Sequence, residues 1–95
     1  MALTETTKVD QIEVVENGSI QIRTATVIER DGVEVTRSFH RHVLHPGSLG
    51  EGDVLVDTDL STQDADVQAI CTAAWTAEVK EAWRLKLVAD KQQLV

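Results

Sequence analysis

The stretch SIQIRTATVIERDGVEVTRSFHRHVLH, residues 19–45, decides the fold of this 95-residue chain. Within it, two runs rich in β-branched residues flank the dipeptide Asp31-Gly32. An Asp-Gly pair between such runs is a strong signal for a β-hairpin closed by a two-residue type I′ turn. The stretch therefore predicts two long antiparallel strands in which Arg30 pairs with Val33.

The apolar pattern of these strands predicts how they pair. Continued from the turn, the predicted pairs are Ile28 with Val35, Thr24 with Phe39, and Ile20 with Val43. One face of the hairpin then collects Ile20, Ile22, Ile28, Val35, Phe39 and Val43. A shift by one residue would set Ile28 against Glu34, so the pattern favours this register. Because strands average about five to six residues, we expect the turn end of this longer hairpin to project as an arm.

A further strand is expected over residues 9–15, joined to the hairpin by a turn at residues 16–18. A two-residue Asn-Gly loop would set a glutamate against an isoleucine. A three-residue loop with Gly18 in the left-handed region instead keeps Ile12 opposite Ile22, so we expect this bulged turn. The result is a three-stranded antiparallel β-meander.

The whole chain, residues 1–95, is predicted to be a single small α+β domain. Its parts are the meander in residues 9–45, an acidic loop in 46–61 and a helical pair in 62–91. The polar residues 1–8 are expected to be frayed, or to be ordered only by a partner. Within the acidic loop, the apolar run at residues 54–56 suits a short edge strand.

Two C-terminal helices complete the predicted fold. Ser61 or Thr62 caps the first helix, with Asp64 in a loose capping box, and Thr76 caps the second, over residues 77–91. Spacings of three and four predict that the first helix buries Val67, Ile70, Cys71 and Ala74. The corresponding face of the second helix carries Val79, Ala82, Trp83 and Leu87. The helices are expected to pack on or beside the apolar face of the sheet, or alternatively against other subunits.

Composition and charge exclude several classes of protein. The formal net charge of −7 disfavours binding to a nucleic-acid backbone. No apolar run approaches the roughly 20 residues of a membrane span, so we expect no membrane association. The first ten residues lack the pattern of a signal peptide, which indicates synthesis in a reducing cytoplasm.

A thin core points to partner chains. The aromatic residues are only Phe39, Trp75 and Trp83, and the single cysteine, Cys71, excludes an internal disulfide. Cys71 lies among apolar residues and is expected to be a buried, inert thiol. Small domains with thin cores lean on disulfides, metals or partner chains, and we therefore expect a homo-oligomer.

The third strand carries the candidate binding residues. The register places Arg37 and Arg41 on the apolar face beside Phe39, where charges are costly unless they are paired. Two sources of acidic partners remain open: the segment 51–66 of the same chain, or a neighbouring subunit. The predicted partner-binding residues are Arg37, Phe39, His40, Arg41, His42, Trp83 and Leu87.

The histidines at the end of this strand are candidate metal ligands. His40 and His42 share a face of the strand and could hold Zn²⁺ together with His45 or Glu13. The predicted pairing sets the cation of Arg23 opposite His40, which works against a bound dication. We therefore expect no metal and no cofactor, and a polar or inter-subunit role for these histidines.

No pattern of catalytic residues is present: the chain has neither a glycine-flanked serine elbow nor a phosphate-binding loop. We therefore expect that it is not an enzyme.

Three blocks of the chain, RTATVIERDG (residues 23–32), SFHRHVLHPG (38–47) and QDADVQAICTAAWTAEVKEAW (63–83), resemble small structural proteins of tailed bacteriophages. The resemblance covers somewhat under half of the chain and carries no functional residues onto these positions. It implies a virion component of the tail or its fibres, assembled in the host cytoplasm and acting through contacts with other virion proteins. The alternative function is a small metal- or ligand-binding regulatory module that uses His40, His42 and His45.

Overall fold

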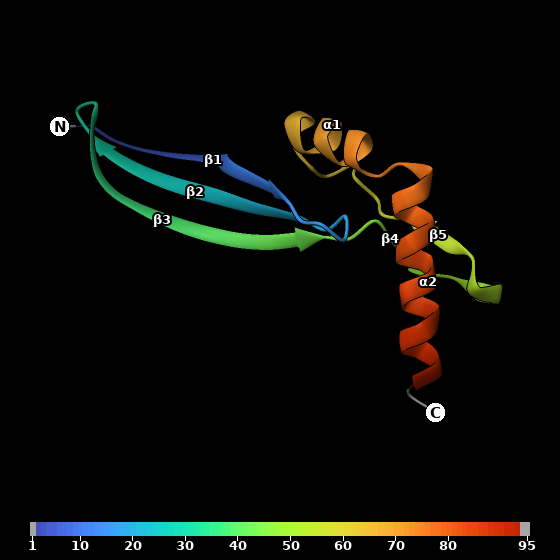
Figure 1. Ribbon diagram of the computed structural model, residues 1–95. Helices are drawn as coiled ribbons and strands as arrows, with labels where there is room; N and C mark the ends of the chain where they lie inside the picture. Colours follow the sequence, from blue (N-terminus) through green and yellow to red (C-terminus); the bar gives the residue numbers. More distant parts are fainter. Residues whose placement is uncertain (1, 94–95) are drawn as a thin grey trace.

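The computed structural model describes residues 2–93 of the chain, which form an elongated molecule with extents of 59 × 28 × 22 Å (Figure 1). Its elements are β1 (Leu3–Val14), β2 (Ile20–Arg30), β3 (Val33–Leu44), β4 (Gly47–Leu49), a 3-10 turn η1 (Glu51–Asp53), β5 (Leu55–Asp57), α1 (Ala65–Ala74) and α2 (Ala77–Gln93). The radius of gyration is 17.7 Å, against about 12–13 Å for a compact domain of this length. The α+β class, a three-stranded antiparallel meander followed by two helices, is confirmed.

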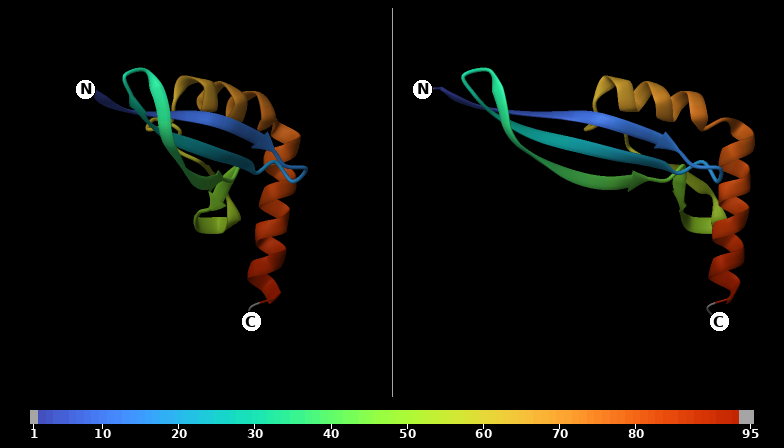
Figure 2. Two further views of the ribbon diagram at one scale, coloured as in Figure 1. Left: turned by 90° about the vertical axis from the view of Figure 1, so that its left-hand side faces the viewer. Right: turned by 60° about the vertical axis from the view of Figure 1, so that its left-hand side comes forward.

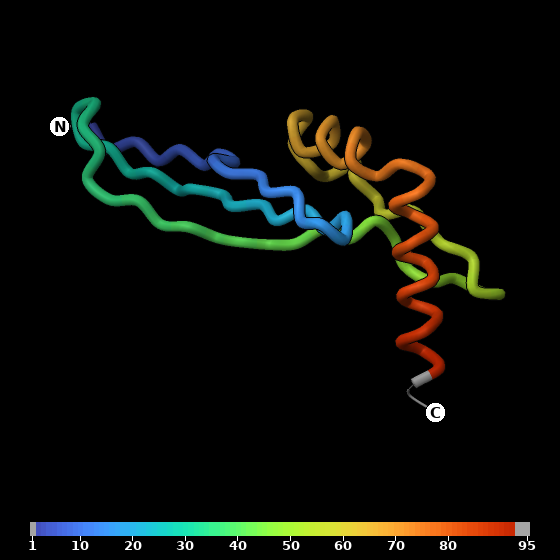
Figure 3. The backbone as a smooth tube through the Cα atoms, viewed as in Figure 1, coloured from blue at the N-terminus to red at the C-terminus, as the bar shows by residue number. Residues whose placement is uncertain are grey.

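The three long strands form a ribbon in the order β1-β2-β3, which we call the β-arm (Figures 1 and 3). At its tip, Asp31 and Gly32 have φ angles of 51° and 83°, as the two central residues of a type I′ turn require. Arg30 pairs with Val33, as predicted. The turn at the other end, with Gly18 at φ 93°, pairs Ile12 with Ile22 and confirms the bulged turn.

Beyond the tip, the register of β3 differs from the prediction. A bulge at Val35 inserts one residue, so that Ile28 pairs with Thr36 and Ala25 pairs with Phe39. Every residue of β3 from Thr36 onward therefore points to the face opposite the predicted one. The physical reason lies at the base of the strand, where the bulge turns Leu44 rather than Val43 into the core.

Because of the bulge, the two faces of the β-arm carry chemically different side chains. The core face carries Ile20 and Ile22 of β2, which are almost fully buried. The opposite face, here called the arginine face, carries Arg23, Arg37, Phe39 and Arg41. Placing the two arginines of β3 on the apolar face was therefore wrong. Their side chains lie on the face opposite the core.

The first strand is longer than expected. Its described residues begin pairing at Leu3, opposite Arg30, and not at residue 9. Ala2 exchanges hydrogen bonds with the tip turn, where its N–H donates to Asp31 Oδ1 and its carbonyl accepts from Asp31 N–H, both at 3.0 Å. The expectation that residues 1–8 are frayed or need a partner was thus wrong for the described residues 2–8, which the tip anchors.

The core lies between the base of the β-arm and α1, with Trp75 beside it. Val67 and Cys71 of α1 are fully buried against Ile20 and Ile22, as the helical spacing predicts. Figure 2 shows α1 lying over the ribbon near its base, whereas α2 runs away from it. The indole of Trp75 donates a hydrogen bond of 2.6 Å to the Gly18 carbonyl, which joins the helices to the β1–β2 turn.

A second, two-stranded sheet lies beyond the first. Gly47 pairs with Asp57 and Leu49 with Leu55, so the chain forms a new strand where the sequence indicated only the end of the sheet. A Cβ at position 47 would lie 2.6 Å from the Val56 carbonyl, which explains the glycine. α2 packs on this sheet.

The helix caps were predicted in part. Thr76 Oγ1 accepts a hydrogen bond of 3.3 Å from Val79 N–H and caps α2 as expected. The first helix, however, begins at Ala65 without a side-chain cap, because Ser61 is held in a turn in which its N–H donates to Asp59 Oδ1. Ala82 is exposed, so the predicted buried face of α2 was wrong at that position.

Candidate functional site

The longest run of exposed residues in the described part of the chain lies on the β-arm. Residues 31–41, the tip and most of β3, are all exposed. The exposed large hydrophobic residues on β3 are Val33, Val35, Phe39 and Val43. Folded proteins rarely leave a long edge strand with apolar side chains uncovered, because it can recruit another strand. This arm is therefore the candidate interaction surface.

Asp10 holds the arginine face together. Its carboxylate accepts two hydrogen bonds of 2.9 Å from Arg23, from Nε and Nη2. Arg37 Nη1 lies 3.8 Å from the same carboxylate, and Arg37 Nη2 donates to Glu34 Oε1 at 2.8 Å. The acidic partners of Arg37 thus come from the β-arm itself, and neither the segment 51–66 nor a second subunit supplies these contacts.

These ion pairs shift the pKa values of both carboxylates. The hydrogen bond from Arg23 lowers the pKa of Asp10, and the one from Arg37 lowers the pKa of Glu34, in each case against the opposing effect of desolvation. Both groups are consequently ionised at neutral pH. They orient guanidinium groups and are poorly suited to proton transfer, for which a pKa near the working pH is best.

The ring of Phe39 lies close to two guanidinium groups. Arg23 Cζ is 4.4 Å from the centroid of its ring and Arg41 Cζ is 5.9 Å from it, both within the range of a cation–π contact. Within residues 2–93, Arg41 forms no ion pair. It is therefore an arginine available to a carboxylate from outside the chain.

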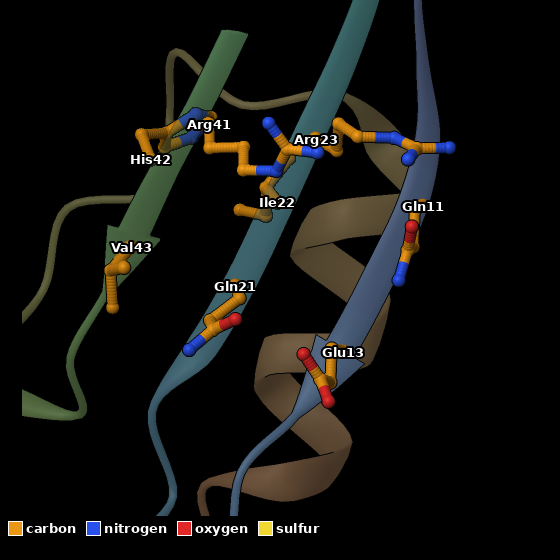
Figure 4. A pocket seen from close by; sticks show the side chains of 8 residues that line it. All are labelled: Gln11, Glu13, Gln21, Ile22, Arg23, Arg41, His42 and Val43. Carbon is orange, nitrogen blue, oxygen red and sulfur yellow. The ribbon is translucent and has the colours of Figure 1, made fainter. Parts of the chain in front are cut away.

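Arg41 borders a hollow of about 340 Å³ at the base of the arm. Figure 4 shows the Arg41 side chain extending from β3 towards β2, while that of Arg23 extends from β2 towards β1. The lining residues are Gln11, Glu13, Gln21, Ile22, Arg23, Arg41, His42 and Val43. Six of these eight residues are polar or charged and the hollow is open to solvent, so it suits a partner's side chains.

The three histidines do not gather at one point. His40 and His42 lie on the core face of the arm, not opposite Arg23 and Gln21, with ring centroids 6.2 Å apart. His45 instead turns to the body, where Nδ1 lies 2.9 Å from Ser19 Oγ and the ring stacks on Trp83 at 5.0 Å. In the part of the chain that the structure describes, no three potential metal ligands come together.

The two predicted partner-binding residues of α2 lie apart from the arm. Trp83 is only 8 % exposed, and its indole donates to the Gly47 carbonyl at 2.9 Å, so it fixes α2 to the second sheet. Leu87 is partly buried on the same helix. The candidate surface therefore keeps Arg37, Phe39, His40, Arg41 and His42, and gains Arg23 and Asp10, which sequence reasoning missed.

Comparisons with models of known protein families, with curated proteins and with solved structures give no significant match. Neither helix within residues 2–93 is both long and apolar enough to span a bilayer.

Proposed function

We propose that this chain is a non-enzymatic structural subunit of a phage virion, in the tail or its fibres, which assembles with copies of itself and with other virion proteins. The observation that carries the assembly role is the three-stranded β-arm, whose two edge strands are each 12 residues long. The virion setting is supported by the resemblance of three sequence blocks to phage structural proteins.

The energetics of the arm favour association. Four large hydrophobic residues of β3 are exposed, and fully burying one such side chain contributes about 1.5–3 kcal/mol. A free strand edge also offers backbone donors and acceptors to a partner strand. The β-arm forms within the single chain, and a partner that covers it would stabilise it further.

The chemistry of the arm fits recognition better than catalysis. Its two best-placed carboxylates, Asp10 and Glu34, are held by arginines that lower their pKa values. Arg41 is left for a partner carboxylate, beside the ring of Phe39. Arginine and aromatic residues are the types most enriched among the energetically dominant residues of protein interfaces.

The test of the virion role is quantitative mass spectrometry of purified particles from the source. The proposal expects the chain in a fixed ratio to the other tail proteins, retained after washing in high salt. A variant of the chain that lacks the tip half of the β-arm should no longer be retained in the particles. Particles that contain no copies of the unmodified chain would overturn the virion role.

A further inference from the structure

We propose that β3 of one copy pairs edge to edge with β1 of a second copy, with the two β-arms pointing in the same direction. The inference rests on the proposed function, because it specifies how copies of the chain assemble. It joins unlike edges, so that each copy offers one edge and accepts the other. Such a contact repeats from copy to copy and closes into a ring when the rotation permits.

The topology makes this continuation possible. β1 and β3 both run antiparallel to β2, so they are parallel to each other. In the described part of the chain, no backbone hydrogen bond reaches the outer edge of either strand. Copies that point the same way can therefore extend the strand order β1-β2-β3 into the next β1 through a parallel pair.

At equal height along the arm, apolar residues of the two edges match: exposed ones at the tip, and Val14 with the partly buried Leu44 at the base. Leu3 of β1 and Val33 of β3 face the same residue of β2 near the tip, and Val14 and Leu44 face the same residue at the base. Leu3, Val33 and Val14 are 62 %, 69 % and 55 % exposed in the single chain. Pairing at equal height brings apolar residues together at both ends of the arm.

The charged residues match at the same height. Arg41 is level with Gln11, because both pair with Arg23, and Glu13 is the next residue of β1 on that face. The guanidinium without an ion pair would therefore approach Glu13 of the next copy. Phe39 is level with Lys8 through Ala25, which sets a cation beside the ring.

Other arrangements of the same edges match less well. With the strands reversed and their ends aligned, Glu34 of β3 would face Glu13 of β1, and like charges directly opposite are destabilising. Pairing β3 with β3 would bring together two strands that each carry Arg37 and Arg41. Pairing β3 with β3 also leaves the hydrophobic residues of β1 uncovered. The reversed β1–β3 pairing would still set Val33 opposite Val14, so it is the facing glutamates that count against it.

Disulfide cross-linking tests the pairing directly. Thr7 and Ser38 are exposed and both pair with Thr26, so they lie at one height on opposite edges. Within a chain they are two strand spacings apart, about 10 Å, which is too far for a disulfide. Across the proposed contact they are neighbours at about 5 Å. Mild oxidation of the double variant Thr7→Cys with Ser38→Cys should give a ladder of linked chains.

The controls separate the alternatives. The unmodified chain, whose only cysteine is buried, should stay unlinked, and so should each single variant. Linked dimers from Ser38→Cys alone would show β3–β3 pairing and overturn the proposal. A ladder that is strongest with Thr36→Cys in place of Ser38→Cys would support the edge pairing with a stagger of two residues. One that is strongest with His40→Cys would match the reversed pairing, in which Thr7 faces His40, and would overturn the proposed direction.

Light scattering over a range of concentrations separates this inference from the proposed function. Oligomers that form no β1–β3 link would overturn the edge pairing but leave the assembly role intact. A chain that stays monomeric at all concentrations would overturn self-pairing, and mass spectrometry of particles would then decide the virion role alone.

A charge swap tests the contact of Arg41. Arg41→Glu should raise the concentration of half-association about tenfold, and adding Glu13→Arg should recover most of that loss. The matched control is Arg30→Glu, which makes the same change on β2, between the two edges, and should have a smaller effect. Equal effects of the two single variants, or no recovery in the double variant, would overturn the proposed contact.

Discussion

At the scale of single residues, Asp10 organises the arginine face, because it bonds Arg23 and lies 3.8 Å from Arg37. It occupies a bulge in β1, between Val9 and Gln11. The bulge allows Val9 and Ile12 both to pack on the core although they are three residues apart. One irregular position thus serves the core on one side and an ion-pair network on the other.

The pKa of Asp10 makes a prediction about pH. Because Arg23 lowers the pKa of this carboxyl in the folded state, the ion pair stabilises the fold above the ordinary pKa of an aspartate, about 3.9. That contribution is lost as the pH falls through the lower, folded value. Asp10→Asn should therefore lower the melting temperature at pH 7 and not at strongly acidic pH. A difference in melting temperature between the two chains that stays the same at every pH would contradict this.

Arg37 and Arg41 should respond differently to the same substitution. Arg37 bonds Glu34 and lies near Asp10, so Arg37→Glu should lower the melting temperature of the chain. Arg41 forms no ion pair within the described residues, so Arg41→Glu should leave it nearly unchanged. Thermal melting at a fixed, low protein concentration makes the comparison. If Arg41→Glu were the more destabilising, the assignment of Arg41 to a partner would fail.

At the scale of elements, the sequence predicted what local chemistry determines. The Asp-Gly turn, the bulged turn at Gly18, the buried stripe of α1 and the Thr76 cap all depend on residues within one or two turns of each other. The bulge at Val35 has no such local signal. It is favoured by Leu44 reaching the core nine residues further along, which only the tertiary structure reveals.

The candidate site was predicted in part for the same reason. Arg37, Phe39 and Arg41 could be chosen from composition, because charges beside an aromatic residue on an edge strand stand out. Their face depended on the register and was wrong by one residue. Arg23 could have been found from its cation–π contact with Phe39, but the two side chains share a face only in the bulged register.

The two turn glycines of the β-arm should differ in their tolerance of a side chain. Gly18 and Gly32 both have positive φ, but a Cβ at Gly32 meets nothing within 4 Å, whereas one at Gly18 would lie 2.5 Å from Val79 Cγ1. Gly32→Ala should cost about 1–2 kcal/mol of unfolding free energy, from the backbone conformation alone. Gly18→Ala should cost about 1–3 kcal/mol more through overpacking. Denaturant unfolding measures both, and equal losses would contradict the packing of α2 on the turn.

At the scale of the whole molecule, one end is a packed body and the other is an arm that few contacts cover. The buried apolar residues of the core cluster are Ile20, Ile22, Val67, Cys71 and Trp75, all at or near the base of the arm. Towards the tip, β2 is covered by its neighbouring strands, but β3 is exposed along most of its length. A fold that leaves this much strand edge open is stabilised further by whatever pairs with it.

Hydrogen exchange of the β-arm amides, followed over a range of protein concentrations, tests the central claim most directly. The claim is that the outer edges of β1 and β3 are the surfaces through which copies assemble. The account predicts that the outward-facing amides of Leu3–Val14 and Val33–Leu44 exchange quickly in dilute solution and become protected as the chain associates. Edge amides that exchange equally fast at every concentration would contradict it.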